Sequence, residues 1–399
     1  MSGKSMSTND FAAMIAEYID VQTPAMFALL EKMVGMESGS YDVELVNTFG
    51  EYLETEFAAL GCTLKRYPSK NTGFPLRATL LPPGSAPDAR RILLVGHRDT
   101  VFPAGAVAKR PFSRDEKNCY GPGVADMKGG IVAGLYAMKA LLAMRDKTGP
   151  LPIDVLLSSD EEIGSEASTP AIADCCPTAA VCFCLEPARA NGGIVIERSG
   201  AGVFTIEVRG KTSHSGIAFS DGVSAIIPLA EIITEISALS DDKGGRTVNV
   251  GVMQGGNGGF SVPGHASAEV SLRFDSLELR DFLVENIRKA VTARNKGEVK
   301  ATMTDPLFYL PIQRSKVNDE LYGIVQDAGN AFGLRIEGVS TRGSADSGVP
   351  ASKGVPTICA MGPIGVNLHS DEEYMVSASL PERTKVLALS MVNAGKQFL

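Results

Sequence analysis

Carboxylate and imidazole side chains gather just after apolar runs in this sequence. The residues concerned, in chain order, are His97, Asp99, Asp126, Asp160, Glu161, Glu162, Glu186 and His369. Imidazole and carboxylate groups together form a ligand set that suits Zn²⁺, with Mn²⁺ and Co²⁺ as substitutes. Two histidines and three carboxylates match a site for two such ions in which one carboxylate bridges, and a metal pair of this kind activates water and stabilises an oxyanion. The residue types therefore predict a hydrolytic metal site.

Each motif also has an ordinary structural explanation. A run of acids such as Asp160, Glu161 and Glu162 is usually a solvated turn, and a histidine at the end of a strand is usually a structural hydrogen-bonding group. The chain has only four histidines, however, and two of them, His97 and His369, lie beside carboxylates. The coincidence of several such features favours one shared site.

The apolar runs that precede these residues are typical of buried parallel strands. RILLVGHRD, IDVLLSS and AAVCFCLEP are continuous apolar segments, and they alternate with helical spacing such as that of MKGGIVAGLYAMKALLAM. The alternation predicts an α/β fold, with a three-layer αβα catalytic domain over residues 1–200 and 309–399. Functional groups gather beyond the carboxyl ends of the strands in such sheets, so the acids and histidines are expected to converge.

A different pattern occupies residues 201–308. VFTIEVRGK alternates like a half-exposed strand, GVSAIIPLAEIITEISALS has helical spacing, and two further strand patterns follow it. LELRDFLVENIRKAVTARN then reads as a second amphipathic helix before the short strand VKATMT. The order βαββαβ predicts a ferredoxin-like α+β domain inserted into the first.

Composition argues against several classes of partner. Lys and Arg number 38 against 46 Asp and Glu, and the net charge of −8 disfavours nucleic acid or an anionic membrane as the main partner. No segment approaches the roughly 20 apolar residues that span a bilayer, and the N-terminus lacks the apolar stretch of a secretory signal. We therefore expect a cytoplasmic protein. Its seven cysteines form no CxxC pair, which favours reduced buried thiols, with a thiolate metal site or a nucleophilic cysteine as alternatives.

Taken as a series, the motifs resemble those of the dizinc M20 metallopeptidases. The series runs H-x-D, GxxDMKGG, DEEIGS, a later EP, SHSG and HSxxE, in this order and over nearly the whole chain. The family includes glutamate carboxypeptidases, succinyl-diaminopimelate desuccinylases, acetylornithine deacetylases and aminoacylases. The segments MVGMESGSYD and GSADSGVPASKGVP look most like the glutamate carboxypeptidase branch.

The resemblance implies a role for each of five metal ligands. His97 and Glu186 would be terminal ligands of one zinc ion. Glu162 and His369 would be terminal ligands of the other, and Asp126 would bridge the two. The implied cofactor is two Zn²⁺ ions per subunit.

The resemblance also implies roles for residues that bind no metal. Asp99 would orient the His97 imidazole, and Glu161 would be the general base that takes a proton from the metal-bound water. His214, in the segment KTSHSG, would reach the active site of a partner subunit and stabilise the oxyanion there. Arg273 would bind the carboxylate of the substrate through its guanidinium fork.

The predicted function is hydrolysis of an amide bond by zinc-bound hydroxide, with release of a C-terminal amino acid from an N-acyl amino acid or short peptide. A glutamate-type carboxypeptidase acting as a homodimer through residues 201–308 is the leading expectation. Relatives commonly carry an asparagine that contacts substrate where this chain has Phe260. This apolar ring favours the alternative of an N-acyl-amino-acid deacylase, or aminoacylase, that prefers apolar amino acids. A non-catalytic protein that binds amino-acid derivatives is the alternative of another class.

Overall fold

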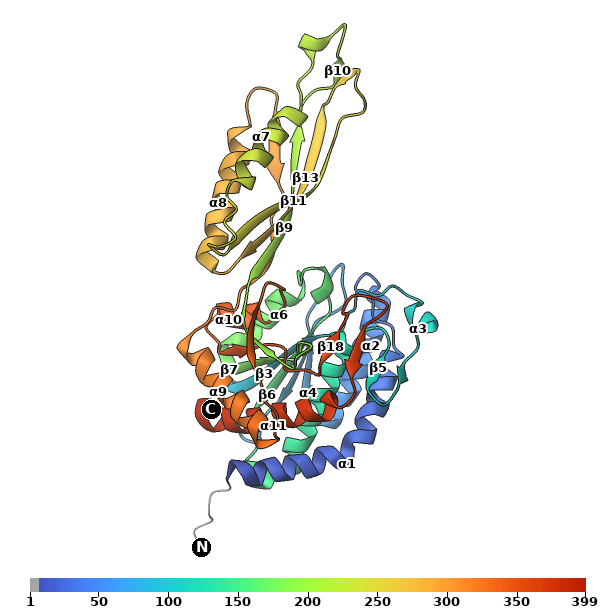
Figure 1. Cartoon of the computed structure of the whole chain (residues 1–399), viewed down its shortest axis with the longest axis vertical. Helices are drawn as coiled ribbons and strands as arrows, with labels where there is room; N and C mark the ends of the chain where they lie inside the picture. The colour runs from blue at the N-terminus through green and yellow to red at the C-terminus, as the bar shows by residue number, and fades with distance from the viewer. Residues whose placement is uncertain (1–6) are drawn as a thin grey trace. The chain divides into compact units, whose positions relative to one another are not determined.

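The computed structural model describes residues 7–399, which form two compact units (Figure 1). The first unit holds the described residues up to Glu197 together with Arg314–Ser340 and Ala345–Leu399. The second unit holds Arg198–Gln313 and Thr341–Ser344. The chain thus leaves the first unit after its central sheet is almost complete and returns to finish it.

A six-stranded sheet forms the centre of the first unit. Its strands, in spatial order, are β1 (Thr63–Arg66), β2 (Leu76–Leu80), β6 (Ile153–Ser158), β3 (Arg91–His97), β7 (Ala179–Cys184) and β17 (Thr357–Ile358). β3 pairs in parallel with β6 and β7, and β7 pairs in parallel with β17, whereas β2 runs antiparallel to β6. Every residue of β3, β6 and β7 is buried, as expected for strands that are covered on both faces.

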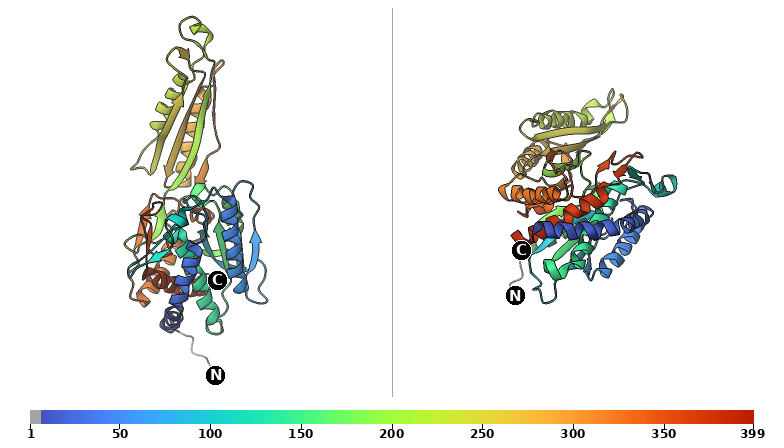
Figure 2. Two further views of the ribbon diagram at one scale, coloured as in Figure 1. Left: turned by 90° about the vertical axis from the view of Figure 1, so that its right-hand side faces the viewer. Right: turned by 60° about the horizontal axis from the view of Figure 1, so that its bottom comes forward.

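Helices cover this sheet in a three-layer αβα arrangement (Figures 1 and 2). One group, whose members contact one another, consists of α1 (Thr8–Val34), α4 (Gly129–Ala143), α9 (Lys316–Ala331) and α11 (Ser379–Phe398). Elsewhere on the sheet, α2 (Val43–Ala59) contacts β1 and β2, and α6 (Ser168–Cys175) contacts β6. Because α4 packs against α1, α11 and β3, its sequence is apolar on nearly all sides. The predicted fold class is confirmed.

A smaller sheet joins segments that are distant in the sequence. Its strands, in spatial order, are β18 (Gly365–Val366), β19 (Tyr374–Val376), β5 (Asn118–Tyr120) and β4 (Ser113–Arg114). β19 pairs antiparallel with β5, with Tyr374 opposite Tyr120. This pairing brings the chain that follows His369 beside the chain that precedes Asp126.

The second unit is a sheet with two helices. The strand order is β11 (Arg246–Gly255), β13 (His265–Phe274), β9 (Gly200–Arg209) and β14 (Lys300–Met303), and β15 (Leu307–Tyr309) also pairs with β9. The helices α7 (Ile226–Ser237) and α8 (Leu277–Ala293) contact each other and lie on one face of the sheet (Figure 2). The alternating burial along β9 and β13 shows why their sequences alternate between apolar and polar residues. The βαββαβ order expected of a ferredoxin-like domain is present.

None of the described helices is long and apolar enough to cross a lipid bilayer.

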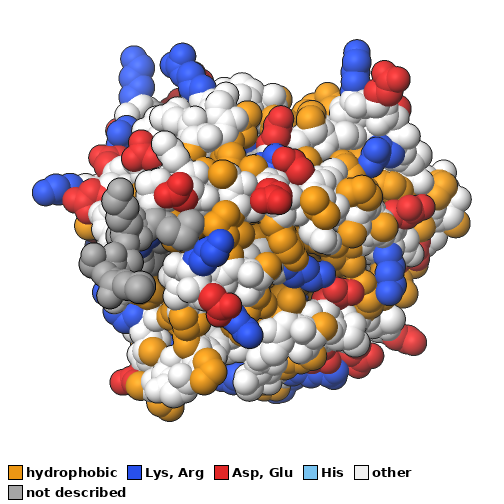
Figure 3. All heavy atoms as spheres, turned by 90° about the horizontal axis from the view of Figure 1, so that it is seen from below, with side chains coloured by type: hydrophobic (Ala, Val, Ile, Leu, Met, Phe, Trp, Pro, Cys, Tyr) orange, Lys and Arg blue, Asp and Glu red, His pale blue; other side chains and the backbone are white. Residues whose placement is uncertain are grey.

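On the face of the molecule that Figure 3 shows, Lys and Arg side chains are interspersed with Asp and Glu side chains.

Replacing Leu94 by Ala in β3 is expected to lower the free energy of unfolding by about 2–5 kcal/mol, because the change leaves a cavity beside a fully buried position. Val21→Ala is the control, since Val21 is 71% exposed, and it should change the free energy of unfolding by no more than about 0.5 kcal/mol. Urea denaturation followed by circular dichroism measures both. Equal losses for the two variants would contradict the central position of β3.

Candidate metal centre

The acids and histidines singled out in the sequence lie at one edge of the six-stranded sheet. His97 is the last residue of β3, and Glu186 follows the end of β7 by two residues. Glu161 and Glu162 form a short 3-10 turn that follows β6 almost directly. Because β3 lies between β6 and β7 and is parallel to both, the carboxyl ends of the three strands meet.

Asp126 comes from the tight segment Val124–Lys128 that precedes α4, and the peptide bond after Asp126 is cis. The first turn of α4 comes unusually close to the chain that follows β7. A Cβ atom on Gly130 would lie only 2.0 Å from the carbonyl oxygen of Leu185, so glycine is required there. This close approach is consistent with the short distance between the carboxylates of Asp126 and Glu186, whose ligand atoms lie within 4.8 Å of each other.

The two histidines face opposite oxygens of Asp126. His97 Nε2 lies 3.1 Å from Oδ1, and His369 Nε2 lies 3.2 Å from Oδ2. His97 Nε2 is also 3.6 Å from Glu186 Oε1, and His369 Nε2 is 3.1 Å from Glu162 Oε2. The ligand atoms of His97, Asp126 and Glu186 lie within 4.8 Å of one another, as do those of Asp126, Glu162 and His369. The structure thus brings all five expected ligands together, in two groups of three that share Asp126.

The Asp99 carboxylate binds the backbone of the turn that carries Glu161 and Glu162, the acidic turn. Its oxygens accept hydrogen bonds from the N–H groups of Glu161 and Glu162, each at 3.1 Å, and from Ser40 Oγ at 2.7 Å. The His97 ring meets Asp99 mainly through the backbone, since Nδ1 lies 2.9 Å from the Asp99 carbonyl oxygen and 3.6 Å from Oδ1. The sequence indicated that Asp99 contacts the His97 imidazole, but it did not indicate that Asp99 binds the backbone of the acidic turn.

Two more buried carboxylates support the same turn. Asp160 accepts hydrogen bonds from the N–H of Ala167 at 2.7 Å and from the hydroxyl of Ser168. Asp346 accepts hydrogen bonds from the hydroxyls of Ser158 and Ser165, one on either side of the turn. Sequence reasoning missed this role of Asp346. Its signal was available in GSADSG, where an aspartate stands between serines in a glycine-rich segment.

Glu373 is another buried carboxylate, and the sequence assigned it no role. It accepts hydrogen bonds from the N–H groups of Gly123, Ala125 and Asp126. Glu373 is the last residue of the motif HSxxE, so its place in the motif was visible in the sequence, although its contacts were not.

Burial and close charges set the protonation behaviour of the cluster. Burial raises the pKa of Glu161 well above its usual value, His97 acts in the opposite direction, and the nearby Glu186 raises the pKa further. Hydrogen bonds to Asp126 and Glu162 raise the pKa of His369 to about 10. The cluster therefore attracts positive charge, whether protons or metal cations.

The donor set fits a metal ion. Within the part of the chain that the structure describes, Glu162 Oε1 is buried and has no hydrogen-bond partner, while Oε2 contacts His369. A buried carboxylate oxygen left unsatisfied costs free energy, and a coordinated cation removes that cost. Imidazole nitrogens and carboxylate oxygens are the donors that Zn²⁺ accepts, with Co²⁺ and Mn²⁺ as substitutes.

The remaining residues expected at the site belong to the second unit. His214 is exposed, and its Nδ1 accepts hydrogen bonds from the N–H groups of Gly216 and Ile217. Arg273, on β13, donates a hydrogen bond to Ser344 Oγ at 2.9 Å. The Phe260 side chain is 84% exposed. Their expected roles in catalysis and substrate binding stay predictions.

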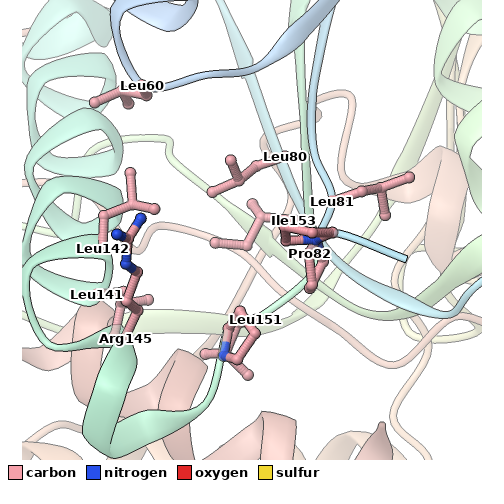
Figure 4. A pocket seen from close by; sticks show the side chains of 11 residues that line it. Leu60, Leu80, Leu81, Pro82, Leu141, Leu142, Arg145, Leu151 and Ile153 are labelled. Atoms are coloured by element: carbon pink, nitrogen blue, oxygen red, sulfur yellow. The ribbon is translucent and has the colours of Figure 1, made fainter. Parts of the chain in front are cut away.

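An apolar cavity of about 150 Å³ opens near the start of β6 (Figure 4). Its lining is formed by leucine, isoleucine and proline side chains from several elements, together with Arg145. Ile153, the first residue of β6, belongs to this lining, whereas the acidic turn follows the last residue of the strand. Because this lining contains no carboxylate, histidine or cysteine, it offers no group for the chemistry expected at the carboxyl ends.

Comparison with known proteins gives consistent matches. The family model described as peptidase family M20/M25/M40 matches residues 93–393. Carboxypeptidase G2 from Pseudomonas sp. (strain RS-16) is 28% identical over 94% of this chain and 90% of its own length. Acetylornithine deacetylase from Myxococcus xanthus is 29% identical over 60% of this chain and 64% of its own length.

Solved structures share the fold. The aminopeptidase PepT from Bacillus cereus superposes with a TM-score of 0.72 at 21% identity, covering 93% of this chain and 98% of its own. An M20 family metallo-carboxypeptidase from Sulfolobus solfataricus superposes with a TM-score of 0.72 at 18% identity, covering 93% of this chain and 99% of its own.

Zn²⁺ is expected to raise the melting temperature of the metal-free protein, because the donor cluster exists only in the folded chain. A free ion at 100 times its Kd corresponds to about 2.7 kcal/mol of added stability. Asp126→Asn should lose most of this gain, since the amide keeps only one oxygen between the two histidines. Asp371→Asn, at an exposed position in the His369 segment, is the matched control. Equal stabilisation of both variants in a thermal scan would contradict the central place of Asp126.

Proposed function

The chain belongs to peptidase family M20/M25/M40 and is therefore a metal-dependent hydrolase, and from this premise we propose that it releases a C-terminal amino acid by hydrolysing an amide bond with two zinc ions. The observation that carries the proposal is the position of Asp126, whose two oxygens face His97 and His369 separately. Similarity to carboxypeptidase G2 over 94% of the chain supports a glutamate-type carboxypeptidase.

The five ligands divide between the two ions. His97, Glu186 and one oxygen of Asp126 would hold one ion, and Glu162, His369 and the other oxygen of Asp126 would hold the second. Two bound zinc ions would polarise the amide carbonyl and lower the pKa of a water molecule.

Glu161 is the proposed general base. Its side chain is 8% exposed, and its ligand atoms lie within 4.8 Å of those of His97 and Glu162, so it borders both donor groups. The hydrogen bond from its N–H to Asp99 fixes the backbone from which the side chain projects. A Glu161 carboxylate oxygen accepts the proton of the attacking water and delivers it to the nitrogen of the leaving amine.

Residues of the second unit are proposed to recognise the substrate. Burial and the neighbouring Arg342 lower the pKa of Arg273, and no ion pair satisfies Arg273 among the described residues. A partly buried guanidinium that has no carboxylate partner within the described chain is suited to bind the free carboxylate of a substrate. His214 is proposed to donate a hydrogen bond to the oxyanion.

The subunit is proposed to act as a cytoplasmic homodimer formed through residues 201–308. Several apolar side chains of this segment are strongly exposed, among them Ile217, Phe219 and Ile227, at 89%, 68% and 62%. Exposed apolar groups of this kind are common at protein interfaces. All seven cysteines are buried and free, which fits a reducing compartment.

A deacylase that prefers apolar amino acids is the second candidate. Phe260 offers an exposed apolar ring, which favours an apolar amino acid. Acetylornithine deacetylase is among the similar proteins and supports deacylation, although it does not bear on the apolar preference. The non-catalytic alternative is set aside, because the chain belongs to a family of hydrolases and carries Glu161 together with every expected ligand.

Replacing Glu161 by Gln should lower kcat for amide hydrolysis about 10²- to 10⁴-fold, because the amide cannot accept the proton. The assay is amino-acid release from acetyl, benzoyl, succinyl and aminoacyl derivatives of free-carboxylate amino acids, with zinc-loaded protein. Glu166→Gln, an exposed acid close by in the sequence, should retain full activity. A fully active Glu161→Gln variant would exclude Glu161 as the base. Faster release of apolar amino acids than of glutamate by the unmodified protein would select the deacylase.

Replacing Arg273 by Ala should raise KM for substrates with a free carboxylate by about 10- to 100-fold, in line with loss of a charge-assisted hydrogen bond. Substrates whose carboxylate is blocked as an amide should be hydrolysed equally by both proteins. Arg209→Ala, a change at an exposed arginine in the same unit, is the control. If the KM values for free and blocked substrates rise together, Arg273 does not read the carboxylate.

A further inference from the structure

Glu373 links two distant segments that each carry an expected metal ligand. Its Oε1 accepts hydrogen bonds from the N–H groups of Ala125, at 2.8 Å, and Asp126, at 3.0 Å. Its Oε2 accepts a third from Gly123 at 3.2 Å. The side chain is fully buried, so water does not compete for these donors. One carboxylate thereby binds the backbone on both sides of Val124, at Gly123 and Ala125, and the backbone of Asp126 itself.

The three N–H groups form a concave donor surface that suits an anion. Backbone donors that converge in this way act as an anion-binding site, and hydrogen bonds to a carboxylate are about twice as strong as those between neutral groups. Gly123 has a φ of +69°, which turns its N–H toward Glu373 at low steric cost. The segment that carries Asp126 is therefore shaped around the Glu373 carboxylate.

The other end of the link is His369. Only three residues separate it from Glu373, and the loop between them is braced internally by a hydrogen bond from the N–H of Glu373 to the carbonyl of Ser370 at 3.1 Å. Arg110 Nη1 donates to the carbonyls of Asp371, at 2.6 Å, and Glu373, at 3.3 Å. A short braced loop transmits the position of Glu373 to His369.

His369 needs such support more than the other ligands do. Its side chain is 54% exposed, whereas those of Asp126 and Glu162 are 8% and 4% exposed, so little packing holds the ring. Its backbone has a φ of +62°, a left-handed conformation that non-glycine residues adopt at a cost. The surrounding loop must therefore impose this conformation.

We propose that Glu373 is a positioning residue that sets the separation of Asp126 and His369 and so builds the metal site formed by Asp126, Glu162 and His369. The inference rests on the proposed two-metal function, but it concerns binding and not turnover. Glu373 is not one of the five expected ligands and belongs to none of the groups whose donor atoms could hold a metal ion. It acts through the Asp126 backbone on one side and through the His369 loop on the other.

The test compares Glu373→Gln and Glu373→Asp with Glu372→Gln in the full-length protein. Gln keeps the size of the side chain but places an NH₂ group against one of the backbone donors, and Asp keeps the charge but is one methylene too short. Glu372→Gln makes the same chemical change at the neighbouring exposed position. Each is made in the His97→Ala background, where the site of Asp126, Glu162 and His369 is the one left complete.

Binding is measured by titrating metal-free protein with Co²⁺ and following its visible absorption. Both Glu373 variants should bind about 10- to 100-fold more weakly than the His97→Ala parent, the usual effect of losing a group that orients a ligand. Glu372→Gln should match the parent. In the metal-free state, hydrogen exchange of the segment 121–128 should be faster in the Glu373 variants and unchanged in Glu372→Gln.

The possible results separate the two proposals. If the unmodified protein binds fewer than two Co²⁺ ions per chain, the two-metal function fails. If it binds two and the Glu373 variants bind Co²⁺ as tightly as their parent, the function stands and the positioning role is overturned. A fall in melting temperature with unchanged affinity would likewise assign Glu373 to general stability and overturn the role.

Discussion

The structure of the first unit depends on how it accommodates buried negative charge at one edge of its sheet. Carboxylates brought out of water repel one another and must find hydrogen-bond donors or cations. The carboxylates that surround the expected ligands, which we call the outer ones, accept hydrogen bonds from groups within the chain. Asp99 and Glu373 accept from backbone N–H groups, and Asp346 accepts from two serine hydroxyls. The inner carboxylates, such as Asp126, face the histidines, and in the proposed function metal cations would supply the positive charge that they lack.

This arrangement divides the acids by task. The outer carboxylates shape the backbone, because each one accepts bonds from a segment that carries an inner ligand. Asp99 holds the turn with Glu161 and Glu162, and Glu373 holds the segment with Asp126. The backbone of Glu162 and of Asp126 is thus held by hydrogen bonds one layer further out, and a change in that layer is expected to alter metal binding without removing any ligand.

In the proposed function, the hydrolytic chemistry and the choice of substrate belong to different units of the chain. The first unit carries every expected metal ligand and the proposed base, and the family match covers most of that unit. The second unit carries Arg273, His214 and Phe260, the groups expected to read the substrate. If the proposed roles hold, a few side chains of the second unit can change the preferred amino acid; the similar proteins include both a carboxypeptidase and a deacetylase.

The sequence by itself determined the fold class, because apolar runs typical of buried parallel strands alternate with segments of helical spacing. The five expected ligands came from the motif series that resembles the M20 family. The sequence also indicated that Asp99 lies beside His97, since the two are neighbours in the chain. Only the tertiary structure decided that Asp99 holds the acidic turn, that Asp346 ties its two sides, and that Glu373 reaches Asp126. These contacts join residues far apart in the sequence, and most of the hydrogen-bond donors to the three carboxylates are backbone N–H groups. Since every residue except proline carries such a group, no residue pattern identifies which of them a buried carboxylate will meet.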